Sequence, residues 1–190
     1  MKYVTIIGSR DITNEEFVLL RELATKLNYR GYILRSGGAS GADSAINHLH
    51  NVEIIVPWSG FNGLNHDGRR VFALDLLPDK KLAMKKALEI HPASHLLNNV
   101  TTKLHTRNIY QVIGPRGKNG VKSDLVVYCS DVNKKEIPIG GTRTAVVYAQ
   151  ELGIPTYNIR DAVSDIENLL WEVLQAIEDG KEEENKKQEL

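Results

Sequence analysis

The strongest constraint on the fold is an alternation of short apolar runs, rich in β-branched residues, with longer segments that have helical periodicity. The first run, residues 2–8 (KYVTIIG), predicts a buried strand that ends at a glycine. Residues 13–16 (TNEE) then form a capping box, and apolar residues recur at helical spacing up to Gly31. Similar runs predict further strands at residues 32–36, 52–58, 123–130 and 154–159.

This alternation predicts a single α/β domain over residues 1–179, with a doubly wound, mainly parallel sheet of about five strands and helices on both faces. Residues 60–102, after the third strand, form a loop and helical insertion that includes an amphipathic helix at 79–90. A last helix is expected with Asp161 as its N-cap. Residues 180–190 are charged and almost free of apolar side chains, which predicts a disordered tail. Further helices are expected at residues 41–50, 101–114 and 140–153.

The composition disfavours several classes of protein. The chain has 24 Lys and Arg residues and 24 Asp and Glu residues, so its formal net charge is zero. Binders of duplex DNA usually have a basic excess, so this charge disfavours a nucleic-acid partner. The single cysteine, Cys129, excludes an internal disulfide and a zinc site built on cysteines. No apolar run reaches the ~18 residues that span a bilayer, so we expect a soluble, cytoplasmic protein without a membrane partner.

Small and hydroxyl-bearing residues occur where the predicted strands end, which is where sheets of this kind bind ligands. Residues 8–11 (GSRD) and 36–43 (SGGASGAD) follow the first two strands, and residues 140–144 (GGTRT) open a later helix. Backbone N–H groups at the start of a helix can bind a phosphate where glycine leaves them accessible. The alternative is a tight turn that needs glycine for its φ angle or for close packing. Neither glycine loop is a Walker A motif or a dinucleotide fingerprint, so we expect no cofactor.

Several polar residues near these loops admit more than one role. Asp43 is either an acid favoured by a helix dipole, a group that braces the loop, or an acceptor for a ribose hydroxyl. Arg10 either pairs with Asp11 on the surface or reaches a phosphate. Arg107 and Asn108 are too polar for the apolar face of their helix, so they belong to a solvated face or to the ligand site. The spacing of His, Cys and acidic residues matches no metal motif, so we expect no metal site.

Six short motifs occur in a defined order: GSRD after the first strand, GGASGAD after the second, RN in a later helix, SD before the fourth strand, GGT before a helix, and GIP before the fifth strand. This order resembles the SLOG superfamily of Rossmann-like proteins, over about residues 2–159. Within it, the chain is most similar to the small YspA-like group, and more distantly to the Rossmann domain of DprA, the DNA-processing protein. The resemblance implies a Rossmann-like fold with a site for a nucleotide, a nucleotide derivative or a nucleic-acid phosphate.

The resemblance also implies which residues line that site. Trp58 is similar to a tryptophan of the YspA-like group that follows the third strand, where it would stack on a base. The full set of implied ligand-binding residues is Gly8, Ser9, Arg10, Ser36, Gly37, Gly38, Ser40, Gly41, Asp43, Trp58, Arg107, Asn108, Gly140, Gly141 and Thr142.

A second group of relatives, the LOG-type phosphoribohydrolases, cleaves an N-glycosidic bond and carries a glutamate just inside the helix after a PGGxGT loop. Here no acid occurs between Thr142 and Gln150, and Glu151 lies far into that helix. The general acid–base residue is therefore missing from its expected position. Asp43 is the candidate catalytic residue that would replace this glutamate, and Asp11 is a second candidate.

The main expectation is a protein that binds a phosphate-containing nucleotide ligand in order to sense, sequester or carry it. One alternative is an N-glycosidic hydrolase or transferase that acts on nucleosides or nucleotides. The other is a DprA-like protein that binds single-stranded DNA, which the zero net charge disfavours. The insertion, residues 60–102, is expected to form a lid or the surface of a homo-oligomer.

Overall fold

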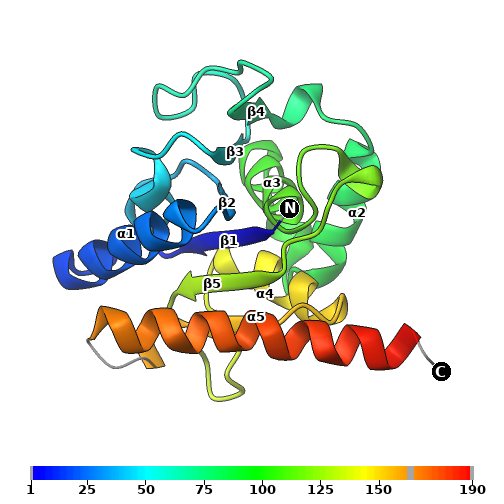
Figure 1. Ribbon diagram of the computed structural model, residues 1–190. Helices are drawn as coiled ribbons and strands as arrows, with labels where there is room; N and C mark the ends of the chain where they lie inside the picture. The colour runs from blue at the N-terminus through cyan, green and yellow to red at the C-terminus, as the bar shows by residue number, and fades with distance from the viewer. Residues whose placement is uncertain (1, 162–164, 189–190) are drawn as a thin grey trace.

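The computed structural model describes residues 2–161 and 165–188. These residues form a sheet of six parallel strands in the order β4-β3-β2-β1-β5-β6, flanked by helices (Figure 1). The predicted doubly wound α/β fold is confirmed, but the sheet has one strand more than the five expected. The strands are β1 (Tyr3–Gly8), β2 (Ile33–Ser36), β3 (Val52–Val56), β4 (Val71–Ala73), β5 (Leu125–Cys129) and β6 (Thr156–Asn158).

The additional strand, β4, lies at the edge of the sheet beside β3, inside the insertion that we expected to contain only loops and helices. It pairs in parallel with β3, with Val71 opposite Ile54. The Asp67 carboxylate fixes the turn before it, because Oδ1 accepts the N–H groups of Arg69, Arg70 and Val71 at 2.8, 2.7 and 2.8 Å. Three residues are too few to show an alternating pattern, so the sequence did not reveal this strand.

Helices cover both faces of the sheet, as predicted. α1, η1 and α5 pack on one face, and α2, α3 and α4 pack on the other. In Figure 1, α5 runs past β5 in orange and red, and the green helices α2 and α3 lie on the opposite side of the molecule from α1. The helical elements are α1 (Asn14–Tyr29), η1 (Gly41–Ile46), η2 (Leu74–Leu76), α2 (Lys80–Ile90), η3 (Ser94–Leu96), α3 (Asn99–Ile113), η4 (Gly117–Asn119), α4 (Thr142–Glu151), η5 (Ile159–Asp161) and α5 (Ile166–Gln188).

Strand β1 shows how one apolar run serves two cores. Val4 and Ile6 belong to the core beneath α1 and α5, whereas Ile7 belongs to the core beneath α3 and α4. Thr5 is fully buried, and its Oγ1 donates a hydrogen bond to the carbonyl of Gln111 in α3 at 2.5 Å. A central parallel strand is buried on both faces, so its sequence is continuously apolar rather than alternating.

The segment after β2 differs from the expected helix over residues 41–50. It forms only η1, a short 3₁₀ turn that ends at Ile46. The Ser44 hydroxyl donates to the carbonyl of Gly41 at 2.7 Å, which satisfies a backbone acceptor within the turn. Because β3 starts at Val52, the chain has little length in which to build a regular helix here.

The C-terminal segment also differs from expectation, because α5 continues to Gln188 and residues 180–188 are helical rather than disordered. Glu, Lys and Gln are strong helix formers, so a charged segment without apolar residues can extend a helix that is already anchored by packing. Gly180 interrupts neither the helix nor its packing, since a Cβ at this position would lie only 2.9 Å from Pro155. Asp161, the expected N-cap, instead lies in η5. No helix formed by residues 2–161 or 165–188 is long and apolar enough to cross a membrane.

Candidate functional site

A cavity of about 350 Å³ lies at the carboxyl end of β1, where the sheet order reverses. β1 pairs with β2 on one side and with β5 on the other, and Gly8 is opposite Cys129 at the end of the second pair. Ligands of open α/β sheets bind at such a switch point. The lining residues are Ile7, Gly8, Ser9, Arg10, Asp11, Ala39, Asp43, Thr101, Leu104, His105, Arg107, Asn108, Gln111, Gly141 and Thr142.

A buried ion pair joins the two halves of the cavity wall. Arg107 Nη1 of α3 donates to Asp43 Oδ2 of η1 at 2.8 Å, and each side chain is only 6% exposed. Asp43 therefore braces the loop after β2 against α3, which is one of the roles left open by the sequence. Arg107 and Asn108 are both buried, so they do not form a solvated face.

Gln111 extends this pair into a polar network beneath the cavity. With its amide oriented to suit its neighbours, its oxygen accepts from Arg107 Nη1 at 3.1 Å and from the Gly37 N–H at 2.8 Å. Its nitrogen donates to Asn108 Oδ1 at 3.0 Å. Asn108 in turn donates through Nδ2 to the carbonyl of Gly141 at 2.7 Å. The network therefore runs from the loop after β2, across α3, to the start of α4.

His105 lies on the same side of α3 and also contacts α4. Its Nδ1 is 2.7 Å from the Thr144 hydroxyl, and its ring packs edge-to-face against His91 with ring centres 4.5 Å apart. Burial, together with the positive charge of Arg107 and the neighbouring His91, lowers the pKa of His105 to about 4. The imidazole is therefore neutral at pH 7 and offers a hydrogen-bonding wall rather than a cation.

The turn after β1 supplies the exposed charge of the site. The Ser9 hydroxyl accepts the N–H of Asp11 at 3.0 Å, which shapes the turn. Arg10 is exposed at the cavity and forms no ion pair within the described part of the chain, so it is not paired with Asp11. Of the two roles left open for Arg10, only contact with a ligand phosphate is left as a hypothesis.

The glycines of the loop after β2 are required by close packing against neighbouring residues. A Cβ on Gly37 would lie 1.0 Å from Arg107 Nη1, so the guanidinium occupies the space that any side chain would need. Gly38 has φ +65°, and its Cβ would lie 2.5 Å from Leu64 Cδ1, on the side of the core. Gly41 has φ +74°, and a Cβ there would lie 2.5 Å from the Ser9 carbonyl. None of these three glycines lines the cavity, whose contacts with this loop come from Ala39 and Asp43.

Other expected site residues also lie apart from the cavity lining. The buried Ser36 hydroxyl donates to the carbonyl of Asp43 at 3.0 Å, within the loop. Trp58 packs edge-to-face on Phe61 and lines a separate shallow hollow beside the N-terminal turn of α3. Ser40 precedes η1, and Gly140 occupies a turn with φ +70° just outside the lining. The cavity thus gathers Gly8, Ser9, Arg10, Asp43, Arg107, Asn108, Gly141 and Thr142 from the expected set.

Sequence reasoning missed several lining residues on α3. Thr101, Leu104, His105 and Gln111 line the cavity together with Asn108. Their spacing of three or four residues is the signature of one helix face, so this signal was present in the sequence. The mostly polar composition of this helix face made it easy to miss, because a polar helix face usually faces solvent.

The position of Glu151 bears on the glycosidase alternative. Glu151 ends α4 and pairs with Lys86 of α2 at 3.1 Å, remote from the cavity lining. Asp43, the other candidate acid, is held by Arg107. The remaining carboxylate at the cavity is that of the exposed Asp11.

No family model and no curated protein matches this chain. A solved structure that matches is that of DNA processing protein A from Helicobacter pylori, a protein that binds single-stranded DNA. The TM-score is 0.50 and the sequence identity is 16%, and the match covers 92% of this chain and 80% of that chain. The two proteins are therefore similar in their Rossmann-like α/β fold.

Proposed function

We propose that this protein binds a nucleotide or a nucleotide-derived ligand in the cavity at the carboxyl end of β1, in a sensing, sequestering or carrier role. The cavity volume of about 350 Å³ falls at the small end of the range of known ligand sites, which suits a single compact ligand. The order of the sequence motifs supports membership of the SLOG superfamily, closest to the YspA-like group.

The observation that carries this proposal is the exposed backbone of Gly141 at the start of α4. Gly141 has φ −63°, and a Cβ there would meet nothing closer than Asn108 Nδ2 at 3.8 Å. Neither strain nor crowding therefore requires glycine at this position, in contrast to Gly8, where a Cβ would lie 2.3 Å from the Cys129 carbonyl. The first N–H groups of a helix lack intrahelical partners and carry the positive end of the helix dipole. At the start of α4, the N–H groups of Arg143 and Thr144 already donate to the carbonyls of Gly140 and Gly141, at 3.3 and 3.2 Å. A phosphate at the cavity wall would therefore use the N–H groups of Gly141 and Thr142.

Two cationic side chains support the same location for an anion. Arg10 is exposed on the wall formed by the turn after β1, where it is available to a ligand. The buried Arg107 Nε makes no hydrogen bond within the described residues, although Nη1 is occupied by Asp43. An anion in the cavity would therefore meet the exposed Arg10 on one wall and, on another, the Arg107 guanidinium, whose charge is paired with Asp43.

A second candidate function is the binding of single-stranded DNA, which the fold similarity to DNA processing protein A favours. A DNA strand would place one phosphate in the same cavity and would continue across the surface. The net charge of zero provides little general attraction for a polyanion. We therefore rank this candidate second.

Ligand-induced thermal stabilisation tests the two candidates with one panel. The panel contains mononucleotides, cyclic nucleotides and dinucleotides, the corresponding nucleosides without phosphate, and an oligo-dT. A ligand present at one hundred times its Kd stabilises the folded state by about 2.7 kcal/mol, which is a measurable shift in Tm. A shift with a small nucleotide but not with its nucleoside supports the proposal. A shift with oligo-dT alone refutes it and favours the second candidate.

Variants locate the ligand. Gly141→Val should remove most of the nucleotide-induced shift, because the side chain blocks access to the start of α4, while the unliganded protein loses at most about 1 kcal/mol of stability. Arg10→Ala should weaken nucleotide binding, whereas the matched control Arg69→Ala, an exposed arginine outside the cavity, should not. Full retention of the shift in folded Gly141→Val would contradict the proposed phosphate position.

A further inference from the structure

A second cavity, of about 500 Å³, lies on the opposite side of α3 from the first. It is enclosed by α2, α3, α4 and the segment after α3 that contains η4. Ile109, Tyr110 and Ile113 of α3 face it, whereas Arg107 and Asn108 of the same helix face the first cavity. The two cavities are therefore separate sites that share one helix.

The floor of the second cavity is apolar. It is formed by Ala83 and Leu82 of α2, by Ile109 and Ile113 of α3, and by the ring of Tyr148 of α4. Leu82 is 66% exposed, so part of this apolar surface faces water. The Tyr148 hydroxyl makes no hydrogen bond within residues 2–161 and 165–188, which leaves a polar group available to a ligand. A flat apolar group would cover this floor and release the water above it.

The rim of the second cavity is basic, with Lys85 and Lys86 from α2 and Lys118 and Lys122 from the segment after α3. Two acids, Glu89 and Asp79, also lie there, and together with Glu151, which pairs with Lys86 at 3.1 Å, they offset part of this charge. Glu89 pairs with Lys86 at 3.2 Å and with Lys85 at 3.9 Å, and Asp79 Oδ2 accepts the N–H of Lys118 at 3.1 Å.

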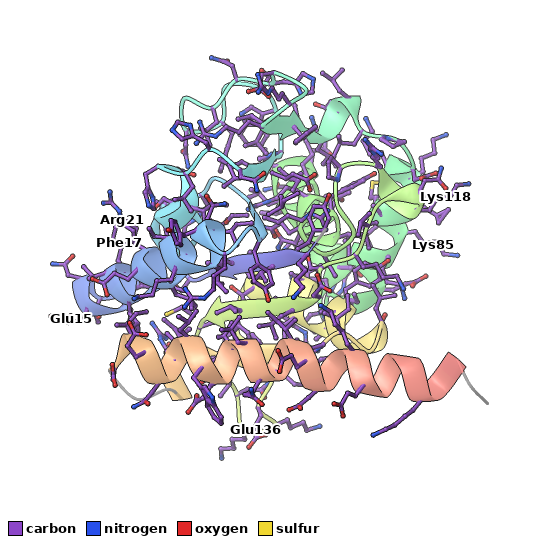
Figure 2. All side chains as sticks on the ribbon, in the orientation of Figure 1. Glu15, Phe17, Arg21, Lys85, Lys118 and Glu136 are labelled. Atoms are coloured by element: carbon purple, nitrogen blue, oxygen red, sulfur yellow. The ribbon has the colours of Figure 1, made fainter. Side chains whose placement is uncertain are left out.

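Lys118 and Lys122 are the free charges of this rim. Both are exposed, and neither forms an ion pair within the part of the chain that the structure describes. Figure 2 shows Lys85 and Lys118 projecting on the same side of the molecule. The rim therefore carries an excess of positive charge, although the whole chain is neutral.

From this combination we infer a second ligand site, which takes a small amphipathic anion: an aromatic or similarly flat apolar body that carries one carboxylate or sulfonate. The body lies on Ile109, Ile113 and Tyr148, and the anionic group lies at the rim between Lys118 and Lys122. This site is independent of the nucleotide proposal, because it uses none of the residues that line the first cavity.

Three probes separate the two requirements in a ligand-observed NMR titration. 2-Naphthoate supplies both the apolar body and the charge, 2-naphthalenemethanol supplies only the body, and acetate supplies only the charge. Naphthoate should bind with a Kd on the order of 1 mM, as its size suggests. The other two probes should bind at least about tenfold more weakly. Equal binding of naphthoate and naphthalenemethanol, or no binding of naphthoate, would overturn the inference.

Charge variants place the probe on the protein. The double variant Lys118→Glu and Lys122→Glu should weaken naphthoate binding by about tenfold in moderate salt. The control Lys81→Glu changes the charge of an exposed residue of α2 outside the cavity and should leave the Kd within about twofold. An equal loss in the control would show a diffuse field effect and would refute a site. Loss on Arg10→Ala instead would place naphthoate in the first cavity and would also refute it.

A cavity-filling variant provides an independent check. Ile113→Trp inserts an indole into the floor, and in a protein that retains its circular dichroism spectrum it should abolish naphthoate binding. The nucleotide-induced shift in Tm should persist in this variant, because Ile113 does not line the first cavity. Unchanged naphthoate binding in folded Ile113→Trp would overturn the inference.

Discussion

Removal of the Arg107 guanidinium should be one of the most destabilising single changes in this protein. In Arg107→Met, Asp43 would keep a carboxylate that is 6% exposed and that has lost its partner at 2.8 Å. Breaking a buried ion pair by removing one partner costs about 3–5 kcal/mol, because the remaining charge is left without compensation. Typical domains have a total stability of about 5–15 kcal/mol, so this variant would be marginally stable.

The matched control is Lys103→Met, which lies one turn earlier on the same helix, α3. Lys103 forms an ion pair with Asp75 of nearly the same length, 2.9 Å, but the two side chains are 41% and 43% exposed. Exposed ion pairs contribute about 0–1 kcal/mol, so the control should lose at most that amount. Comparison of the two variants therefore isolates the effect of burial from that of ion-pair geometry.

Urea unfolding followed by circular dichroism at pH 7 measures both variants. With a urea m-value of about 1–3 kcal/mol per M, the expected loss of about 3–5 kcal/mol in Arg107→Met moves the midpoint down by roughly 1–5 M. The double variant Asp43→Asn and Arg107→Met should be more stable than Arg107→Met alone, since it leaves no buried charge. If Arg107→Met costs no more than Lys103→Met, the pair does not organise the cavity wall.

Two further predictions concern other buried polar groups. Because the folded pKa of His105, about 4, lies below that of an unfolded histidine, the unfolded chain takes up the proton first, and the wild type should lose about 1–3 kcal/mol of stability, after allowance for partial exposure, as the pH falls from 6.5 to about 4. His105→Asn should flatten this loss, as urea unfolding at several pH values would measure. Equal pH profiles for the two proteins would contradict the lowered pKa. Arg35→Met should cost about 3–5 kcal/mol in the same assay, because Arg35 is 1% exposed and binds Glu53 and the Val121 carbonyl, each at 2.6 Å. The control Lys26→Met, at the exposed ion pair with Glu167, should cost at most about 1 kcal/mol. Similar losses in the two variants would contradict this ranking.

The sequence predicted the sheet because strands such as β1, β3 and β5 are short apolar runs rich in β-branched residues. The capping box of α1 is present as predicted: the Thr13 hydroxyl accepts the N–H of Glu16 at 3.1 Å, and the Glu16 carboxylate accepts the N–H of Thr13 at 2.8 Å. These features are local, so a short window of sequence contains the information that determines them. β4 and the helical extension of α5 were missed because a short edge strand and a charged helix owe their stability to neighbours.

The candidate site was predicted in part, for a related reason. The strand-end rule located Gly8, Ser9 and Arg10 on the cavity wall, because the end of β1 is fixed by the sheet alone. The roles of Gly37 and Asp43 depend instead on Arg107, which lies far along the chain. A glycine that makes room for a phosphate and a glycine that makes room for an arginine have the same local sequence.

The contact between Gly37 and Arg107 has a consequence for protein engineering. The guanidinium fills the space beside this glycine and binds Asp43 of the same loop, so the observed conformation of the loop after β2 depends on a residue far along the chain. A graft of residues 36–43 into another parallel sheet would fail to keep its shape unless an arginine from a facing helix were transplanted with it. The smallest portable unit is therefore discontinuous in the sequence, and consists of the loop together with the middle of α3.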